Sequence, residues 1–174
     1  MSRYDPDLLA PGLDVVFCGI NPAASAALDG HNFSHRSNRF WTVLHLAGFT
    51  DRRLRPDEEA LLPGYGCGIT AVVERPTARA QAISPEEFRQ VRSSFEIKMR
   101  RYEPKLIAFL GKRALEAMTR ASRLDWGPQP STFAGTATWV LPNPSGLNKN
   151  FTLAALVDAY GELRTALGRP ALQT

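Results

Sequence analysis

The sequence has 174 residues, a net charge of +4 and an isoelectric point near 9.4. This length suits one domain, and we expect residues 1–174 to form a single unit with its own core. No apolar run approaches the ~20 residues that cross a bilayer, and the polar start Met1–Asp7 does not look like a signal peptide. We therefore expect a cytoplasmic protein without a membrane segment. The positive charge is only a mild indication of a polyanionic partner.

Four short apolar runs are predicted to form strands. Runs of this kind suit strands that are buried on both faces of a parallel sheet. They are Val15–Ile20, Ile69–Val73, Leu106–Leu110 and Thr138–Leu141.

Helical patterns lie between and after these runs. The first is Ser37–Ala47, and the second begins at the cap signal Ser84-Pro85 and should run to about Tyr102. Two more are predicted at Lys112–Met118 and Thr152–Leu167. Alternation of strands and helices predicts an α/β fold, namely a three-layer α/β/α sandwich with a central, mainly parallel four-stranded sheet.

Ligands of open parallel sheets bind beyond the carboxyl ends of the strands, so the residues there are the candidates for function. Asn21 follows the first predicted strand, and Pro22 keeps it out of helical geometry. A neutral amide can hold a water molecule or read a base edge, but it is no strong base. The same pattern also fits an Asx turn at a strand end.

The segment Pro142–Lys149 follows the last predicted strand and is rich in Pro, Gly and small polar residues. Such a composition predicts a stiff loop with many hydrogen-bond donors. Leu147 is an isolated apolar residue in this loop. It could act as a wedge between stacked bases, or it could fold back onto the core.

The segment His31–His35 is predicted to be a loop. Its Phe33 could stack on a planar ligand or lie in the core. No nearby Cys or Glu completes a metal set with the two histidines, so we expect no metal. The two cysteines, Cys18 and Cys67, are too few for a disulfide framework and are expected to be buried thiols.

Motifs for nucleotide cofactors are missing. Gly111-Lys112 follows a strand, but no upstream glycine stands at phosphate-loop spacing, and Arg113 occupies the place of the required Ser or Thr. Neither the glycine fingerprint of dinucleotide enzymes nor a hydrolase nucleophile elbow is present. We expect no cofactor.

Several long blocks in a fixed order together resemble the mismatch-specific uracil-DNA glycosylase and thymine-DNA glycosylase family. The resemblance covers nearly the whole chain. The blocks that carry it are Val15–Pro22, Asn38–Trp41, Ala47–Thr50, Leu110–Lys112 and Trp139–Leu147. It implies a uracil-DNA glycosylase fold and hydrolysis of the N-glycosidic bond of a base, uracil above all, that is flipped out of duplex DNA.

The resemblance also implies roles for single residues. Asn21 would position the attacking water, and Asn143 stands where faster relatives carry a catalytic His. The flipped base would stack on Phe33, while backbone N–H groups near Ile20, Phe33 and Ser34 would read its carbonyl edge and stabilise the charge on the departing base. An Asn in place of a carboxylate predicts slow chemistry.

Further implied contacts concern the base and the DNA strand. Ala26 would lie near C5 of the base and leave room for a methyl group, so some thymine release from G·T pairs is expected. Lys149 lacks the planar fork of the Arg that bacterial members more often carry, which affects contacts to the opposite guanine. The residues expected to touch DNA are Ser145, Gly146, Leu147, Asn148, Lys149 and Lys112.

We therefore expect a monofunctional, monomeric enzyme that acts on uracil opposite guanine, and on etheno-cytosine, in double-stranded DNA containing a mismatched or damaged base. No lysine is obviously placed to form a Schiff base. An alternative is a lesion-binding DNA protein with little turnover. A nucleotide-binding α/β hydrolase is a third reading, which the missing phosphate motifs weaken.

Overall fold

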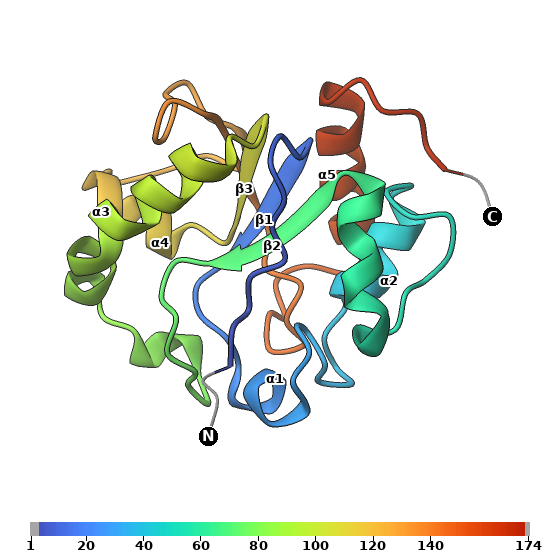
Figure 1. The fold of residues 1–174 in the computed structure, drawn as a ribbon, viewed down its shortest axis with the longest axis horizontal. Coiled ribbons are helices and arrows are strands. Elements are labelled where there is room, and N and C mark those ends of the chain that lie inside the picture. Colours follow the sequence, from blue (N-terminus) through green and yellow to red (C-terminus); the bar gives the residue numbers. More distant parts are fainter. Residues whose placement is uncertain (1–3, 173–174) are drawn as a thin grey trace.

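The computed structural model describes residues 4–172 as an α/β fold built around one twisted sheet (Figure 1). The strand order is β2-β1-β3-β5-β4, and the first four of these are parallel. Only β4 pairs antiparallel, with β5. The strands are β1 (Val15–Gly19), β2 (Cys67–Ala71), β3 (Leu106–Leu110), β4 (Gly127–Pro128) and β5 (Ala137–Leu141).

The parallel sheet confirms the predicted fold class, but the sheet has five strands rather than four. The fifth, β4, has two residues at the sheet edge and contains a proline, so no apolar run announces it. Strand β2 begins two residues earlier than predicted, because Cys67 pairs with Val15 at the start of β1. Gly68 there lies against Leu13, where a larger side chain would not fit.

Helices cover both faces of the sheet, which gives the expected three layers (Figure 1). One face is covered by α2 (Phe40–Leu46), η1 (Pro56–Tyr65) and α5 (Leu153–Ala166), and the other by α3 (Pro85–Tyr102) and α4 (Arg113–Thr119). The four predicted helices are present within a few residues. The elements α1 (Ala24–Asp29), η1 and η2 (Ala80–Ala82) were not predicted.

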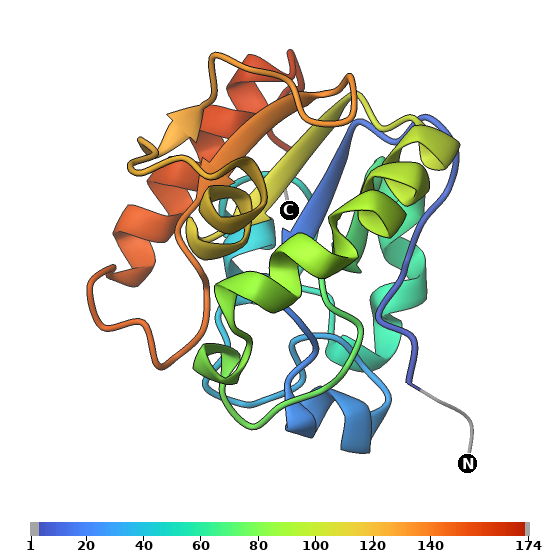
Figure 2. The ribbon, with the colours of Figure 1, turned by 90° about the vertical axis from the view of Figure 1, so that its left-hand side faces the viewer.

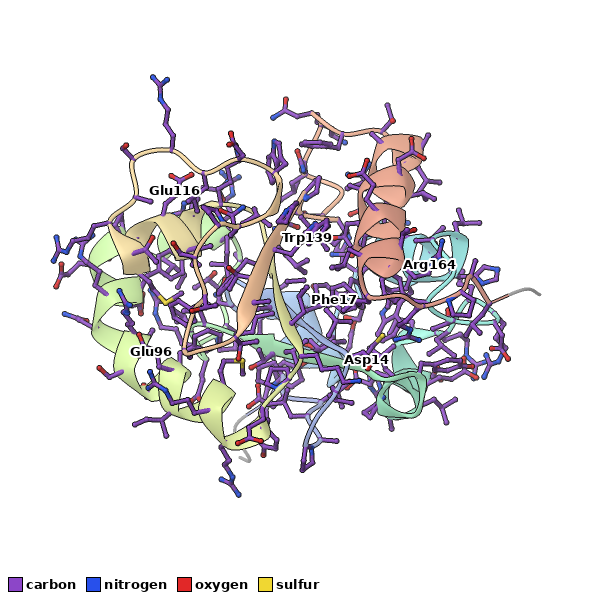
Figure 3. The ribbon with its side chains drawn as sticks, turned by 90° about the horizontal axis from the view of Figure 1, so that it is seen from above. Asp14, Phe17, Glu96, Glu116, Trp139 and Arg164 are labelled. Carbon is purple, nitrogen blue, oxygen red and sulfur yellow. The ribbon has the colours of Figure 1, made fainter. Side chains whose placement is uncertain are left out.

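Each face of the sheet has its own apolar core. On the α2 and α5 face, Phe17 is fully buried and packs edge-on against Phe40 and Phe49, at centroid distances of 5.5 and 5.6 Å. Figure 3 shows Phe17 in the interior beside α5. On the α3 and α4 face, Phe109 packs edge-on against Phe133 at 5.6 Å. These cores fix the sheet and with it the edge from which the candidate loops leave.

The segments that follow β1, β2 and β5 gather on one side of the sheet, the lower side in Figure 2. They lie there because the carboxyl ends of parallel strands share one edge. In the part of the chain that the structure describes, no helix is long and apolar enough to cross a membrane.

Candidate functional site

A cavity of about 620 Å³ opens at this edge of the sheet. That volume is within the usual range for small-ligand sites, ~300–1,000 Å³. The cavity is lined by all but one of the residues singled out from the sequence, namely Ile20, Asn21, Ala26, Phe33, Ser34, Lys112, Asn143, Ser145, Leu147, Asn148 and Lys149.

The exception is Gly146, which does not line the cavity. It packs against Ser37 so closely that a Cβ on Gly146 would come within 2.5–2.6 Å of Ser37 atoms, including the backbone oxygen. Glycine is therefore required at this position for packing, in addition to any contact with DNA.

The amide of Asn21 has a defined orientation. Its Nδ2 donates to the backbone oxygen of Arg75 at 2.9 Å and to the Thr77 hydroxyl at 2.8 Å. The Thr77 hydroxyl donates its own proton to the Arg79 oxygen, so it can only accept from Asn21. Both amide protons are thus engaged, and among residues 4–172 nothing donates to Oδ1, which is left as an acceptor at the cavity.

The loop that carries Asn21 is also tied to the segment after β2 through the backbone. Thr77 N–H donates to the Pro22 oxygen, and the Thr77 oxygen accepts from Ala24 N–H. These bonds join two loops that are more than 50 residues apart in the sequence. They hold Asn21 at the cavity wall rather than in a self-contained Asx turn.

Phe33 lies in the loop that the sequence predicted, and it is both half-buried and at the cavity wall. Its ring stacks on Phe40 with centroids 4.1 Å apart. Its φ of 53° is left-handed, a conformation that costs a residue other than glycine ~1–2 kcal/mol. The surrounding contacts must therefore impose this conformation.

Those contacts come from Asn32, which is buried beside Phe33. Its backbone N–H donates to a Glu59 carboxylate oxygen at 2.6 Å, and its side-chain Nδ2 donates to the Pro6 backbone oxygen. Its backbone oxygen accepts from Trp41 Nε1. Burial raises the pKa of Glu59. His31 Nδ1 lies 3.9 Å from the same carboxylate. The loop is thus fixed from three sides.

Three hydrogen-bond donors of Phe33 and Ser34 have no partner within the described residues. Within the described residues, the N–H groups of Phe33 and Ser34 donate to no acceptor, and the buried Ser34 hydroxyl has no hydrogen-bond partner. Buried polar groups are normally satisfied, so the unpaired Ser34 hydroxyl, with two free N–H groups beside it at the cavity wall, marks a place where a polar ligand would be expected to bind.

The loop of residues 142–151 forms the opposite wall of the cavity, and Arg39 makes most of the side-chain hydrogen bonds that hold it from outside; Tyr160 adds one to the Pro142 oxygen. The guanidinium of Arg39 donates to four backbone oxygens of this loop, at 2.7–3.4 Å. Its acceptors are Pro144, Ser145, Asn148 and Phe151.

Asn143 and Asn148 shape this loop from within. Asn143 Oδ1 accepts from Ser145 N–H at 2.9 Å, and its backbone oxygen accepts from Asn148 Nδ2 at 3.0 Å. The Ser145 hydroxyl accepts from Leu147 N–H. Leu147 is 75% exposed at the tip of the loop and so does not fold back onto the core.

The charged side chains of the cavity wall are all basic among the described residues. Arg79, Lys112, Arg113 and Lys149 line it, and no Asp or Glu does among the described residues. The cysteines offer no nucleophile either, since both are buried and burial raises the pKa of Cys67 to about 11. The wall therefore suits an anionic ligand and provides amide and backbone groups rather than a carboxylate base.

Sequence reasoning missed the residues that fix the site, above all Thr77, Arg39 and Glu59. Thr77 follows a strand end but belongs to no motif. Arg39 lies in the block Asn38–Trp41, which carried the resemblance without indicating a role.

The model of the uracil DNA glycosylase superfamily matches residues 6–164. This match covers both core faces and every loop that lines the cavity. Proteins of this superfamily are DNA glycosylases, hydrolases that act on DNA. The chain belongs to the uracil DNA glycosylase superfamily.

Proposed function

We propose that this protein is a monofunctional, mismatch-specific uracil-DNA glycosylase that hydrolyses the N-glycosidic bond of uracil opposite guanine. The observation that carries the proposal is the orientation of Asn21, whose two amide protons are engaged while Oδ1 stays available at the cavity. Partial G·T activity and release of etheno-cytosine are included, because Ala26 presents only a methyl group to the cavity.

The attacking water is held by Asn21. Its Oδ1 accepts a hydrogen bond from the water and aims it at the anomeric carbon of the flipped nucleotide. The water attacks as the bond to the base breaks, and the sugar passes through an oxocarbenium-like state. The base leaves with the bonding electrons, and the proton that the water loses neutralises the departing base. An amide cannot take the proton strongly, so the rate should be ~10²–10⁴-fold below that of an enzyme with a positioned general base.

The departing base is stabilised on the other side of the cavity. Phe33, supported by Phe40, offers a flat surface for the base, and the unpaired N–H groups of Phe33 and Ser34 can donate to its carbonyl oxygens. Fixed donors of this kind stabilise negative charge that grows in the transition state, as an oxyanion hole does. Asn143, whose Nδ2 has no partner among residues 4–172, is a further donor.

The remaining residues bind and open the duplex. Leu147 enters the space left by the flipped base, and offsets part of an unstacking cost of a few kcal/mol. Lys112, Lys149 and the backbone of residues 145–148 contact the strand and the opposite guanine. Because basic residues and no carboxylates line the cavity among the described residues, the wall favours binding of the DNA backbone phosphates.

A single-turnover assay with excess protein on labelled duplexes tests this proposal. Uracil, thymine, etheno-cytosine and hypoxanthine are placed opposite G and opposite A, and uracil also in a single strand. We expect abasic product to accumulate with time, fastest for U opposite G and slowly for T opposite G. Tight binding without abasic product would instead favour a lesion-binding protein with little turnover, and an inert G·T duplex would contradict the role given to Ala26.

A further inference from the structure

Three side chains from distant parts of the chain meet at the rim of the cavity. They are Lys112 after β3, Trp126 in the connection before β4, and Phe151 at the end of the 142–151 loop. The Lys112 ammonium lies 4.4 Å from the centre of the Trp126 ring. The ring of Phe151 packs edge-on against Trp126, with centroids 5.3 Å apart and an interplanar angle of 82°.

Trp126 is not placed there by the core. It is 44% exposed and belongs to neither apolar cluster. A large aromatic side chain left at the surface beside a cation suits attraction between the charge and the ring face. At an exposed site this attraction changes an equilibrium constant by ~2- to 5-fold.

The charge of Lys112 is uncompensated. Within residues 4–172 the lysines that form ion pairs are Lys98 and Lys105, not Lys112, and no acidic residue lines the cavity. The neighbouring Arg113 is engaged differently, since its guanidinium donates to the backbone oxygens of Ala80 and Ile83. Lys112 is thus a free cation at the rim, held over a ring, and the ligand that fits it is an anion such as a phosphodiester.

We propose that Trp126, braced by Phe151, is a positioning residue that holds the Lys112 ammonium where it binds a backbone phosphate of the strand carrying the flipped nucleotide. This inference rests on the proposed function. A lysine has a long, flexible stem and loses much rotamer freedom when it is fixed on a ligand. Fixing it on the ring before DNA binds reduces that loss.

A double-mutant cycle tests the coupling. Binding to a duplex with an abasic site opposite G is measured at several salt concentrations for Trp126→Leu, Lys112→Met and the double variant. Lys112→Met should lower the slope of log K against log salt by about 0.9, which is one phosphate contact. Trp126→Leu, which keeps apolar packing on Phe151, should weaken binding ~2- to 5-fold with Lys112 present and have almost no effect in the Lys112→Met background.

Lys149→Met is the matched control, because Lys149 also lines the cavity, whereas the lysine that lies over the Trp126 ring among the described residues is Lys112. Its effect should add to that of Trp126→Leu. Trp126→Phe keeps an aromatic face and should recover part of the lost affinity. Thermal melting of each variant establishes that it is folded.

Three results would overturn the inference: an equal effect of Trp126→Leu in both backgrounds, an unchanged salt slope for Lys112→Met, or no recovery with Trp126→Phe. Uracil release by the wild-type protein is followed in parallel. Failure of the proposed function appears as no abasic product, whereas failure of this inference appears as normal release without coupling between Trp126 and Lys112.

Discussion

The two walls of the cavity are held in different ways. The wall with Asn21 and Phe33 is tied to two other segments by several side chains, among them Thr77 and Glu59. The wall with Leu147 depends mainly on the four bonds of Arg39 and leaves its tip exposed. The proposed function gives the chemistry to the first wall and DNA contact to the second, so changes to the two walls should separate the rate of base release from DNA binding.

Arg39→Met should have the largest effect on the second wall. It leaves four backbone oxygens without their donor, and we expect the free energy of unfolding to fall by about 2–3 kcal/mol. DNA binding should weaken as the loop loses its shape. Denaturant unfolding and binding titrations measure both. Arg39→Lys should retain only part of the stability and DNA affinity, because an ammonium cannot span four acceptors. Wild-type values for Arg39→Lys would contradict the role of the guanidinium.

Leu147→Ala should slow release of uracil from duplex by ~10- to 100-fold, because the flipped state loses its wedge. Stability should not change, since Leu147 is exposed. Release from single-stranded DNA, where nothing has to be unstacked, serves as the control and should be unaffected. Equal losses on both substrates would mean that Leu147 supports the chemistry and not the flipping.

Thr77→Val keeps the shape of the side chain but removes the acceptor for Asn21 Nδ2. Loss of one hydrogen bond that orients the amide should slow single-turnover release by ~3- to 10-fold. DNA affinity should stay unchanged, and Thr77→Ser should be close to wild type. A drop in DNA affinity without a change in the rate of release would mean that Thr77 supports DNA binding and not the orientation of Asn21.

Glu59→Gln should have the smallest effect and act through pH. Burial raises the pKa of Glu59 above 4.5, so between the unfolded and folded pKa values the folded state binds more protons. The stability contributed by this group is present below pH 4.5 and is lost as pH rises through the raised pKa. The variant should therefore gain stability relative to wild type as pH rises from acidic to neutral in thermal melts. A difference in melting temperature between Glu59→Gln and wild type that stays constant with pH would contradict a raised pKa of Glu59.

Much of the fold could be predicted, because the four parallel strands follow apolar runs and the four predicted helices carry caps or apolar stripes. Helix α1 could not, since it has six residues and its N-cap, Ala23, provides no side-chain acceptor.

The cavity residues could be predicted because parallel strands deliver their carboxyl ends to one edge. The residues that orient them could not, because their contacts depend on how distant loops pack. Asn21 and Thr77 are 56 residues apart, and Arg39 reaches loop residues more than 100 positions away. Residue type and spacing do not carry such information.

The most direct test of this account is uracil release by Asn21→Ala, measured beside DNA binding of the same variant. With the water-positioning oxygen gone, single-turnover release from a G·U duplex should fall by at least ~100-fold. Affinity for the same duplex should stay within about threefold, because phosphate contacts supply most of it. Release that continues at the wild-type rate, or binding that is lost together with release, would contradict the assignment of Asn21 as the residue that positions the water.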